Sequence, residues 1–462
     1  MSKSSMNMTE GNILKSLIYF AIPVLIGNIL QQLYNVADTA IIGNILGDNA
    51  LASVGASAPV YGLITGFAGG FTNGLAVIIS RYFGANDEIS FKKSVTMSYV
   101  LSAIISLIMT VVGIFTIKPL MIVLKTPPEI ISDTVNYMRI IIAFSVVTVA
   151  YNMIAAMMRA IGNSQAPLYF LAIATFANIG LDFLFIKNFN MGVAGAGYAT
   201  VIAQGISVIL CFVYASKKCD FLIFKKSGLV WDKELFSDLL STGMSMGLMY
   251  AIVSIGSVIL QGSVNSFGTS TITAHTSARK IDEIFMMPLS TMSMATATFV
   301  SQNFGAKKID RVKQGIKYSL IITAVWSAIS IIITIFFRRP LIQALSGTSD
   351  VSVISTASQY VIWNISFFFV LGILLTLRSS LQSVDRKIIP ITGSIIEFLL
   401  KIVASAIVAP KLGYFGICIL EPVIWTVCAV IVFVDYVVFI KQSNAVNENN
   451  FNKKHLKSIV QV

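Results

Sequence analysis

The feature that most restricts the fold of this chain is that its apolar residues come in blocks of roughly 20 to 28. A helix of that length crosses the hydrocarbon core of a bilayer, about 30 Å thick, at about 1.5 Å per residue. Because backbone groups in lipid must all be hydrogen-bonded, helices are expected rather than an open sheet. Only 12% of the residues are charged, against about a quarter in soluble domains. The chain is therefore not an ordinary soluble enzyme.

Breaks at Gly, Pro and Lys clusters divide the apolar blocks into twelve predicted spans, which makes the chain an all-α polytopic membrane protein. The spans are predicted at residues 16–43, 51–80, 94–117, 135–158, 168–186, 193–216, 236–265, 272–302, 318–337, 359–377, 388–409 and 415–440. The first span is kept in the mature protein, because Gln31, Gln32 and Asp38 interrupt its apolar run and no A-x-A-like cleavage site follows.

The distribution of Lys and Arg predicts the orientation in the membrane. With the N-terminus inside, 23 of the 33 Lys and Arg fall on inside segments and six on outside segments. Short cytoplasmic loops are enriched in these residues. We therefore expect a multi-pass protein of the cell membrane with both termini cytoplasmic. The net charge of +12 then reflects topology and attraction to membrane lipid, and no nucleic-acid partner is expected.

A weak internal repeat divides the chain into two similar halves of six spans each. Phe83-Gly84-Ala85 recurs as Phe304-Gly305-Ala306, and Arg159 near the end of span 4 matches Arg378 near the end of span 10. Six spans per half place both copies in the same orientation, related by a pseudo-two-fold axis along the membrane normal. The predicted parts are an N-terminal lobe (1–216), a basic cytoplasmic linker (217–235), a C-terminal lobe (236–441) and a polar, loosely ordered cytoplasmic tail (442–462).

Several short motifs, in this order and at these positions on a twelve-span plan, resemble the multidrug and toxic compound extrusion (MATE) transporters. They are Ala21-Ile22-Pro23, Tyr34 to Thr39 with Gly43 after it, Arg81 with Phe83-Gly84-Ala85, Arg159 to Asn163, Asn178 to Asp182, and Gly192 to Ala196. The likeness covers nearly the whole chain. Within the family, the chain resembles the DinF-like and related bacterial branches. It implies a two-lobed transporter in which acidic residues of the N-terminal lobe couple transport to a cation.

Two carboxylates lie deep in apolar segments and have no Lys or Arg within four residues: Asp38 in span 1 and Asp182 in span 5. An ionisable group inside a span is costly, so it is expected to face protein or water and to have a function. Asn178 lies one turn before Asp182 on the same helix face. The resemblance implies that spans 1 and 5 meet, which would place both acids and Asn178 in one pocket. Adjacent carboxylates would share a proton, bind a cation, or alternate between the two.

The resemblance also implies supporting ligands and substrate contacts. Thr200 would add a hydroxyl to the cation-coupling site, which then consists of Asp38, Asn178, Asp182 and Thr200 and could hold H⁺ or Na⁺. Candidate substrate contacts are Tyr34, Gln31 and Glu397, together with methionines that suit a cavity of variable shape, Met286, Met287 and Met292. Glu397 has Lys401 at i+4, so an ion pair on one helix face is the alternative for this acid.

Catalysis has little support in the sequence. Gly243-Met244-Ser245-Met246-Gly247 matches the G-x-S-x-G hydrolase pattern, but it begins an apolar helix, where its glycines fit small-x-x-x-small packing. The chain has no Gly-Lys pair and hence no P-loop for ATP. We therefore expect a non-enzymatic, cofactor-free, monomeric exporter of amphiphilic and cationic organic compounds, driven by an H⁺ or Na⁺ gradient. The alternatives are a lipid-linked saccharide flippase of the same broad superfamily and, more remotely, a membrane-embedded enzyme.

Overall fold

The computed structural model of the protein describes residues 6–225 and 230–459, with side chains described up to residue 445. Within these ranges all regular structure is helical and no strand occurs. The helices are α1 (Ile13–Leu46), α2 (Asp48–Ala85), α3 (Glu88–Val123), α4 (Pro128–Ala143), α5 (Ser145–Ala160), α6 (Gln165–Asp182), η1 (Phe183–Asn188), α7 (Gly192–Lys218), η2 (Asp220–Leu222), α8 (Lys233–Asn265), α9 (Thr269–Gly305), α10 (Ile309–Ser346), α11 (Val351–Ser366), α12 (Phe368–Ser383), α13 (Ile388–Val403), η4 (Ala404–Val408), α14 (Ala409–Leu412) and α15 (Tyr414–Ile459).

The twelve predicted spans are confirmed, with two of them bent. Ten helical segments are long and apolar enough to cross a membrane singly, and two helix pairs pass the same test together. The pair α4 and α5 bends by 50°, and the pair α11 and α12 bends by 49°. The bends fall at Phe144 and Phe367, the residues between the paired helices. No Pro or Gly adjoins either residue, so the sequence gives no sign of the bends.

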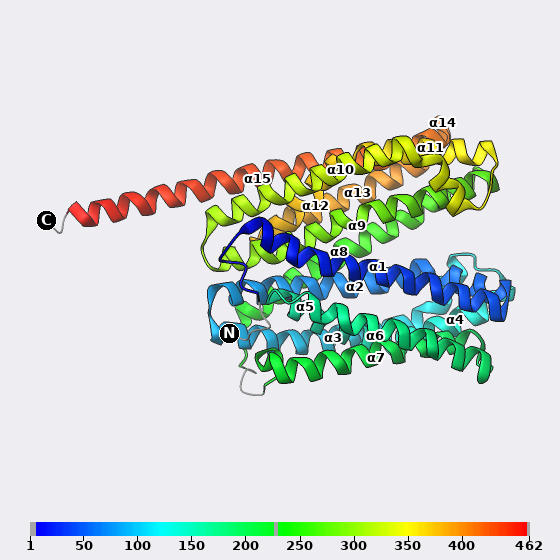
Figure 1. The fold of residues 1–462 in the computed structure, drawn as a ribbon, viewed down its shortest axis with the longest axis horizontal. Helices are drawn as coiled ribbons and strands as arrows, with labels where there is room; N and C mark the ends of the chain where they lie inside the picture. The colour runs from blue at the N-terminus through cyan, green and yellow to red at the C-terminus, as the bar shows by residue number, and fades with distance from the viewer. Residues whose placement is uncertain (1–5, 226–229, 460–462) are drawn as a thin grey trace.

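The two halves of the chain repeat the same order of helices, which form two lobes lying one above the other in Figure 1. A π-helix occurs at the equivalent point of each half, η1 after α6 and η4 after α13. One predicted equivalence is wrong. The helices α5 and α12 both have 16 residues, and the next-to-last residue is Arg159 in α5 but Gln382 in α12. Arg378 therefore lies one helical turn further from the helix end than Arg159 does.

The structure describes the predicted linker and the predicted tail only in part. Residues 226–229 of the predicted linker and 460–462 of the predicted tail lie outside the described residues. The remainder of the expected loosely ordered tail is helical, because α15 continues to Ile459 and extends beyond the bundle at the left of Figure 1.

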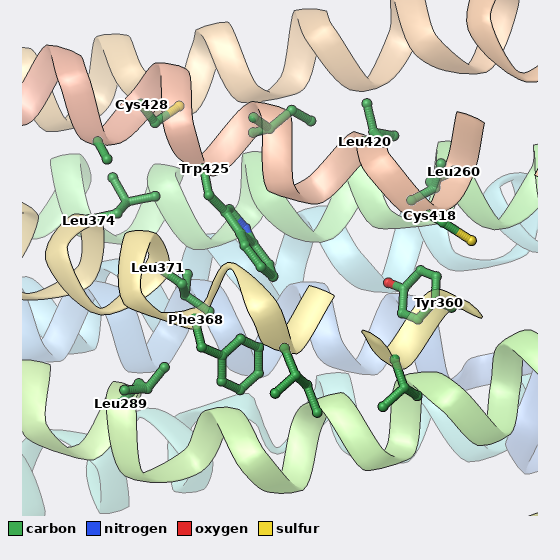
Figure 2. Close-up of a cluster of buried hydrophobic side chains, with 14 of the residues drawn as sticks. Leu260, Leu289, Tyr360, Phe368, Leu371, Leu374, Cys418, Leu420, Trp425 and Cys428 are labelled. Atoms are coloured by element: carbon green, nitrogen blue, oxygen red, sulfur yellow. The ribbon is translucent and has the colours of Figure 1, made fainter. Parts of the chain in front are cut away.

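The core of the C-terminal half is built from aromatic and aliphatic side chains of α8, α9, α11, α12 and α15. Figure 2 shows Trp425 of α15 pointing toward α12, where its ring lies 6.2 Å from that of Phe368. Cys418 and Cys428 are buried in the same core as free thiols, where they pack as small hydrophobic residues.

Helix α1 contacts both lobes. Its first turns, with Leu17 and Phe20, pack against Met292 and Phe299 of α9 in the C-terminal lobe. Its last turns, with Ile41 and Ile42, belong to the N-terminal core instead. Between them, Asn28 donates a hydrogen bond to the hydroxyl of Thr291 at 3.0 Å. Helix α1 therefore links the two lobes.

Helix α2 crosses α8 with the two backbones in contact. A Cβ atom added at Gly70 would lie 2.6 Å from the carbonyl oxygen of Met246, and one at Gly74 would lie 2.6 Å from that of Thr242. From the other side, Gly243 packs against the ring of Phe71. The G-x-S-x-G segment is thus a helix-packing motif, as expected. Not every glycine of α2 takes part in this packing, since a Cβ atom added at Gly62 would meet nothing within 4 Å.

The repeated Phe-Gly-Ala motif marks the closest approach of the two lobes. A Cβ atom at Gly84 of α2 would lie 2.0 Å from the carbonyl oxygen of Gln302 in α9. The repeat-related Gly305 would place one 1.9 Å from the carbonyl oxygen of Arg81. Both distances are shorter than any side chain tolerates, so glycine is required at both positions.

Ion pairs also join the two lobes at one end of the bundle. This end holds residues 81–93, 232–241 and 302–311 and is called the basic end. Arg81 lies 3.5 Å from Asp238 and 3.9 Å from Asp385, both of the C-terminal half. Lys387 binds the same two acids, at 2.8 Å and 3.4 Å. The four side chains therefore join α2 to the second lobe at its edge.

A segment before α1, residues 6–12, lies across the basic end and binds both lobes; it is called the N-terminal strap. The N–H of Met6 donates to the carbonyl oxygen of Ile161 at 3.1 Å. Arg311 donates to three strap carbonyl oxygens at 3.0 to 3.1 Å, those of Met8, Glu10 and Gly11. Gln302 accepts a hydrogen bond from the N–H of Met8 in the strap, and Asn303 and Lys308 donate hydrogen bonds to strap carbonyl oxygens.

We predict that Gly84→Ala lowers the melting temperature of the purified protein in detergent. The new methyl group must push α2 away from α9, and overpacking of this kind costs typically about 1–3 kcal/mol. Gly62→Ala on the same helix is the matched control, because its methyl group meets open space. Equal melting temperatures for the two variants would show that the close crossing does not limit stability.

We predict that Arg311→Gln weakens closure at the basic end. Loss of charge-assisted hydrogen bonds to the strap is expected to favour separated lobes by roughly tenfold. The measurement is the distance between spin labels at Glu88→Cys and Lys307→Cys, both at exposed positions, in a protein whose four native cysteines are buried.

Lys313→Gln, two residues further along α10, is the control for that experiment. Its side chain pairs with Asp310 and Asn444 and not with the strap. An unchanged distance distribution in Arg311→Gln would refute a closing role for the strap.

Candidate functional site

The two intramembrane carboxylates of the N-terminal lobe lie together. Asp38 is on α1 and Asp182 is the last residue of α6, directly before the π-helix η1. Their side chains are 7% and 0% exposed, and the two carboxyl groups are neighbours that make no hydrogen bond to each other. The two acids thus lie near each other where spans 1 and 5 meet, but neither of them lines the neighbouring cavity.

Most polar atoms of this acid pair have no hydrogen-bond partner among the described residues. This holds for both carboxylate oxygens of Asp182, for Oδ1 of Asp38 and for both amide atoms of Asn178. Buried polar atoms without partners are costly. A shared proton would satisfy the facing carboxylates, and a cation would be attracted by the same oxygens.

Tyrosine side chains and the hydroxyl of Thr200 lie near the acid pair. The hydroxyl of Tyr34 lies 2.9 Å from the Thr200 hydroxyl, so the predicted Thr200 ligand is engaged with Tyr34. Tyr61 of α2 lines the same cavity as Tyr34 and Thr200, and Tyr137 of α4 is buried in the N-terminal core. These two tyrosines were missed from the sequence, because they come from spans 2 and 4 and no local pattern links them to Asp38.

The fit to Na⁺ depends on mixed oxygen ligands. Across the described part of the chain, no group of three or more His, Cys, Asp and Glu side chains is placed so that it could hold a metal ion. A sodium ion here would need the two carboxylates with the amide of Asn178 and the hydroxyl of Thr200. A proton needs only Asp38 and Asp182.

A polar cavity of about 250 Å³ lies beside the acid pair within the N-terminal lobe. Of the predicted substrate contacts, Gln31 and Tyr34 line this cavity, as does Thr200, and Tyr61 forms part of the same wall. The two carboxylates themselves are not among its lining residues. The cavity is therefore adjacent to the acid pair and separate from it.

A second cavity, of about 280 Å³, lies between the lobes and is lined by α2 and α5 on one side and by α8, α9, α12, α13 and α15 on the other. It is called the inter-lobe cavity. Of the predicted methionine contacts, Met286 lines this cavity, whereas Met292 packs in the core against α1 and Met287 is not on the cavity wall. Methionines that do line it are Met246, Met249, Met286 and Met294.

Charged side chains of the C-terminal lobe form a network on the wall of the inter-lobe cavity. The predicted pair of Glu397 with Lys401 is confirmed, at 3.1 Å. Lys401 also lies 3.2 Å from Glu421 of α15, and Arg378 lies 3.6 Å from Glu397. Glu421 was overlooked in the sequence, although an acid inside the apolar span 415–440 is the same signal that identifies Asp38.

Two neighbouring acids of α9 on the cavity wall, Asp282 and Glu283, differ in their pairing. Glu283 pairs with Arg279 at 3.7 Å, as the i+4 spacing favours. Asp282, which is 6% exposed and lines the cavity, has one oxygen without a hydrogen-bond partner in the described structure. The inter-lobe cavity thus combines apolar walls with one acid that a cationic group of a ligand could reach.

Known proteins resemble this chain along most of its length. It is 28% identical over 412 residues to "Probable multidrug resistance protein YpnP" of Bacillus subtilis (strain 168), covering 88% of this chain and 91% of that protein. It is 22% identical over 347 residues to "Multidrug export protein MepA" of Staphylococcus haemolyticus (strain JCSC1435), covering 75% and 76%. A crystal structure of MATE in the bent conformation matches with a TM-score of 0.88 at 21% identity, over 95% of this chain and 98% of that one.

A family model matches the chain twice. The MatE model matches residues 23–184 and again residues 246–407, one match in each lobe. The two matches together span more than half of the chain and follow the internal repeat. The chain therefore belongs to the multidrug and toxic compound extrusion (MATE) family.

Proposed function

We propose that this protein is a secondary-active exporter of amphiphilic organic compounds, driven by the entry of a cation, and that it works as a monomer in the cell membrane with its basic end facing the cytoplasm. The single observation that carries the proposal is the buried pair of Asp38 and Asp182 with unsatisfied oxygens. The names of the relatives YpnP and MepA support multidrug export as the physiological class.

The coupling step takes place at the acid pair. Two facing carboxylates repel each other when both are ionised, and uptake of one proton removes that repulsion. Because Asp38 is on α1 and Asp182 on α6, protonation lets the two helices approach. The first turns of α1 pack on α9 of the other lobe, so the same event alters the contact between the lobes. A cation acts on transport only by binding the two states unequally.

The cargo is held in the inter-lobe cavity. Its methionines and Tyr250 offer adaptable apolar contact, and Asp282 offers a carboxylate for a cationic group. Glu397 lines the same cavity, but its oxygens are already paired with Lys401 and Arg378, so it orients these bases rather than binding the cargo alone. Gln31 and Tyr34 would contact cargo that reaches the N-lobe cavity.

A lipid-linked saccharide flippase is the second candidate, because four basic side chains, of Arg159, Arg279, Arg378 and Lys401, line the inter-lobe cavity. Four acids line it too, Asp282, Glu283, Glu397 and Glu421, and a pyrophosphate site would need a surplus of basic groups. A lipid-linked substrate that raises the melting temperature where cationic dyes do not would favour the flippase.

We predict that Asp182→Asn and Asp38→Asn each reduce efflux of a fluorescent cation from cells by at least about tenfold, because an amide cannot take up and release the coupling proton. Asp133→Asn is the control, since Asp133 is an exposed carboxylate on α4. Near-normal efflux in both site variants at normal expression would remove the coupling role from this pair.

In proteoliposomes, we predict that an imposed proton gradient drives export and that a sodium gradient alone does not. The reason is that the hydroxyl of Thr200 is engaged with Tyr34, which leaves the facing carboxylates as the principal acceptors. Transport of the dye under a sodium gradient at equal pH on both sides would contradict this and would assign the site to Na⁺. In that case Asn178→Ala should abolish the sodium dependence.

A further inference from the structure

We propose that the inter-lobe cavity contains a subsite for an oxyanion, a carboxylate or phosphate group of the bound amphiphile, formed by Arg378 of one lobe and Arg159 of the other. The inference rests on the proposed transport function and extends the cargo from cations to amphiphiles that carry both signs of charge.

The first observation is the state of the Arg378 side chain. It is 6% exposed and lines the inter-lobe cavity from α12. Its Nε and Nη2 atoms have no hydrogen-bond partner among the described residues. The nearest carboxylate oxygen, Oε2 of Glu397, lies 3.6 Å from Nη2, which is beyond hydrogen-bond length. An almost fully buried guanidinium with unmade hydrogen bonds is costly unless a ligand completes it.

The geometry of these two atoms indicates which ligand fits. Nε and Nη2 lie on one edge of the planar guanidinium group, and this edge forms two parallel hydrogen bonds with a carboxylate or a phosphate. Bidentate binding of this kind is specific for an oxyanion. An amine or a neutral hydroxyl group would leave one of the two donors unsatisfied.

The second observation is that another arginine lines the same cavity from the opposite lobe. Arg159 lies on α5, and its Nε has no hydrogen-bond partner in the described structure, while its Nη2 donates to Asn73 at a long 3.4 Å. Arg159 and Arg378 are not equivalent residues of the repeat, because their positions along α5 and α12 differ by one helical turn. An oxyanion held by both would link the two lobes.

The remaining charges of the cavity do not compete for this role. Lys401 lies between Glu397 and Glu421, and Arg279 pairs with Glu283, so these bases are neutralised within the protein. Asp282 is the acid with an unpaired oxygen. The cavity therefore offers one acceptor for a cationic group and a pair of donors for an anionic group, with Tyr250 and Trp425 among its aromatic walls.

The test uses two dyes that differ in one group: a rhodamine with a free carboxylate and the same rhodamine as its methyl ester. Binding to the purified full-length protein in nanodiscs is measured by fluorescence anisotropy. The free acid is expected to bind roughly tenfold more tightly than the ester, as charge-assisted hydrogen bonds imply. In Arg378→Gln this ratio of affinities should fall to about one, and in Arg159→Gln it should also fall.

Arg386→Gln is the matched control, because Arg386 lies outside the cavity and contacts Asp435 and Gln442; it should keep the ratio. Melting temperatures identify any variant that fails to fold, and the two cavity arginines give independent measurements. A ratio near one in the unmodified protein, or a ratio retained in both cavity variants, would overturn the proposal.

Two further arms separate the sources of the oxyanion and the two proposals. A short-chain phosphatidic acid that displaces the free-acid dye from the unmodified protein identifies lipid phosphate as an occupant, whereas no displacement identifies the carboxylate of the cargo. Transport of both dyes in proteoliposomes with equal affinities would refute the oxyanion subsite and leave the proposed export intact. Absence of gradient-driven transport would refute the export, while the ratio of affinities still tests the subsite.

Discussion

The backbone contact of α2 with α8 and α9 is the constraint on which the rest of the structure depends. Glycines at the crossing points let these helices approach until peptide groups touch. In a membrane, where lipid tails are as apolar as leucine, such close packing replaces the hydrophobic drive that would hold helices together in water. The ion pairs at the basic end and the inter-lobe cavity both lie beside this crossing. A larger residue there would separate the two lobes that form the cavity.

The two lobes treat buried charge differently. In the C-terminal lobe, Lys401 pairs with Glu397 and Glu421 at 3.1 to 3.2 Å, and Arg378 lies 3.6 Å from Glu397. In the N-terminal lobe, Asp38 and Asp182 lie near each other, and neither forms an ion pair with a basic side chain in the described part of the chain. Paired charges stabilise one arrangement, whereas like charges in contact change their interaction whenever a proton arrives. The asymmetry supports a coupling role for the first lobe and a binding role for the second.

Sequence alone predicted the parts of the molecule that rest on composition and period. Twelve spans, the repeat and the isolated acids follow from hydropathy and from the cost of charge in lipid. The bends at Phe144 and Phe367 could not be predicted, because no Pro or Gly marks them and tertiary packing decides them. The sequence could not predict which methionines line the cavity, for a related reason. Met292 faces α1 and not the cavity, and no local pattern shows which side of a uniformly apolar helix faces a cavity. Glu421, in contrast, was open to the rule that identified Asp38.

The N-terminal strap has a consequence for how the chain is assembled. Its partners Gln302, Asn303, Lys308 and Arg311 are made about 300 residues after Met8. During synthesis the strap must therefore wait, undocked, until α9 and α10 are in the membrane. Docking of the strap would then be among the last steps of folding, and it would report that the second half of the chain has been inserted.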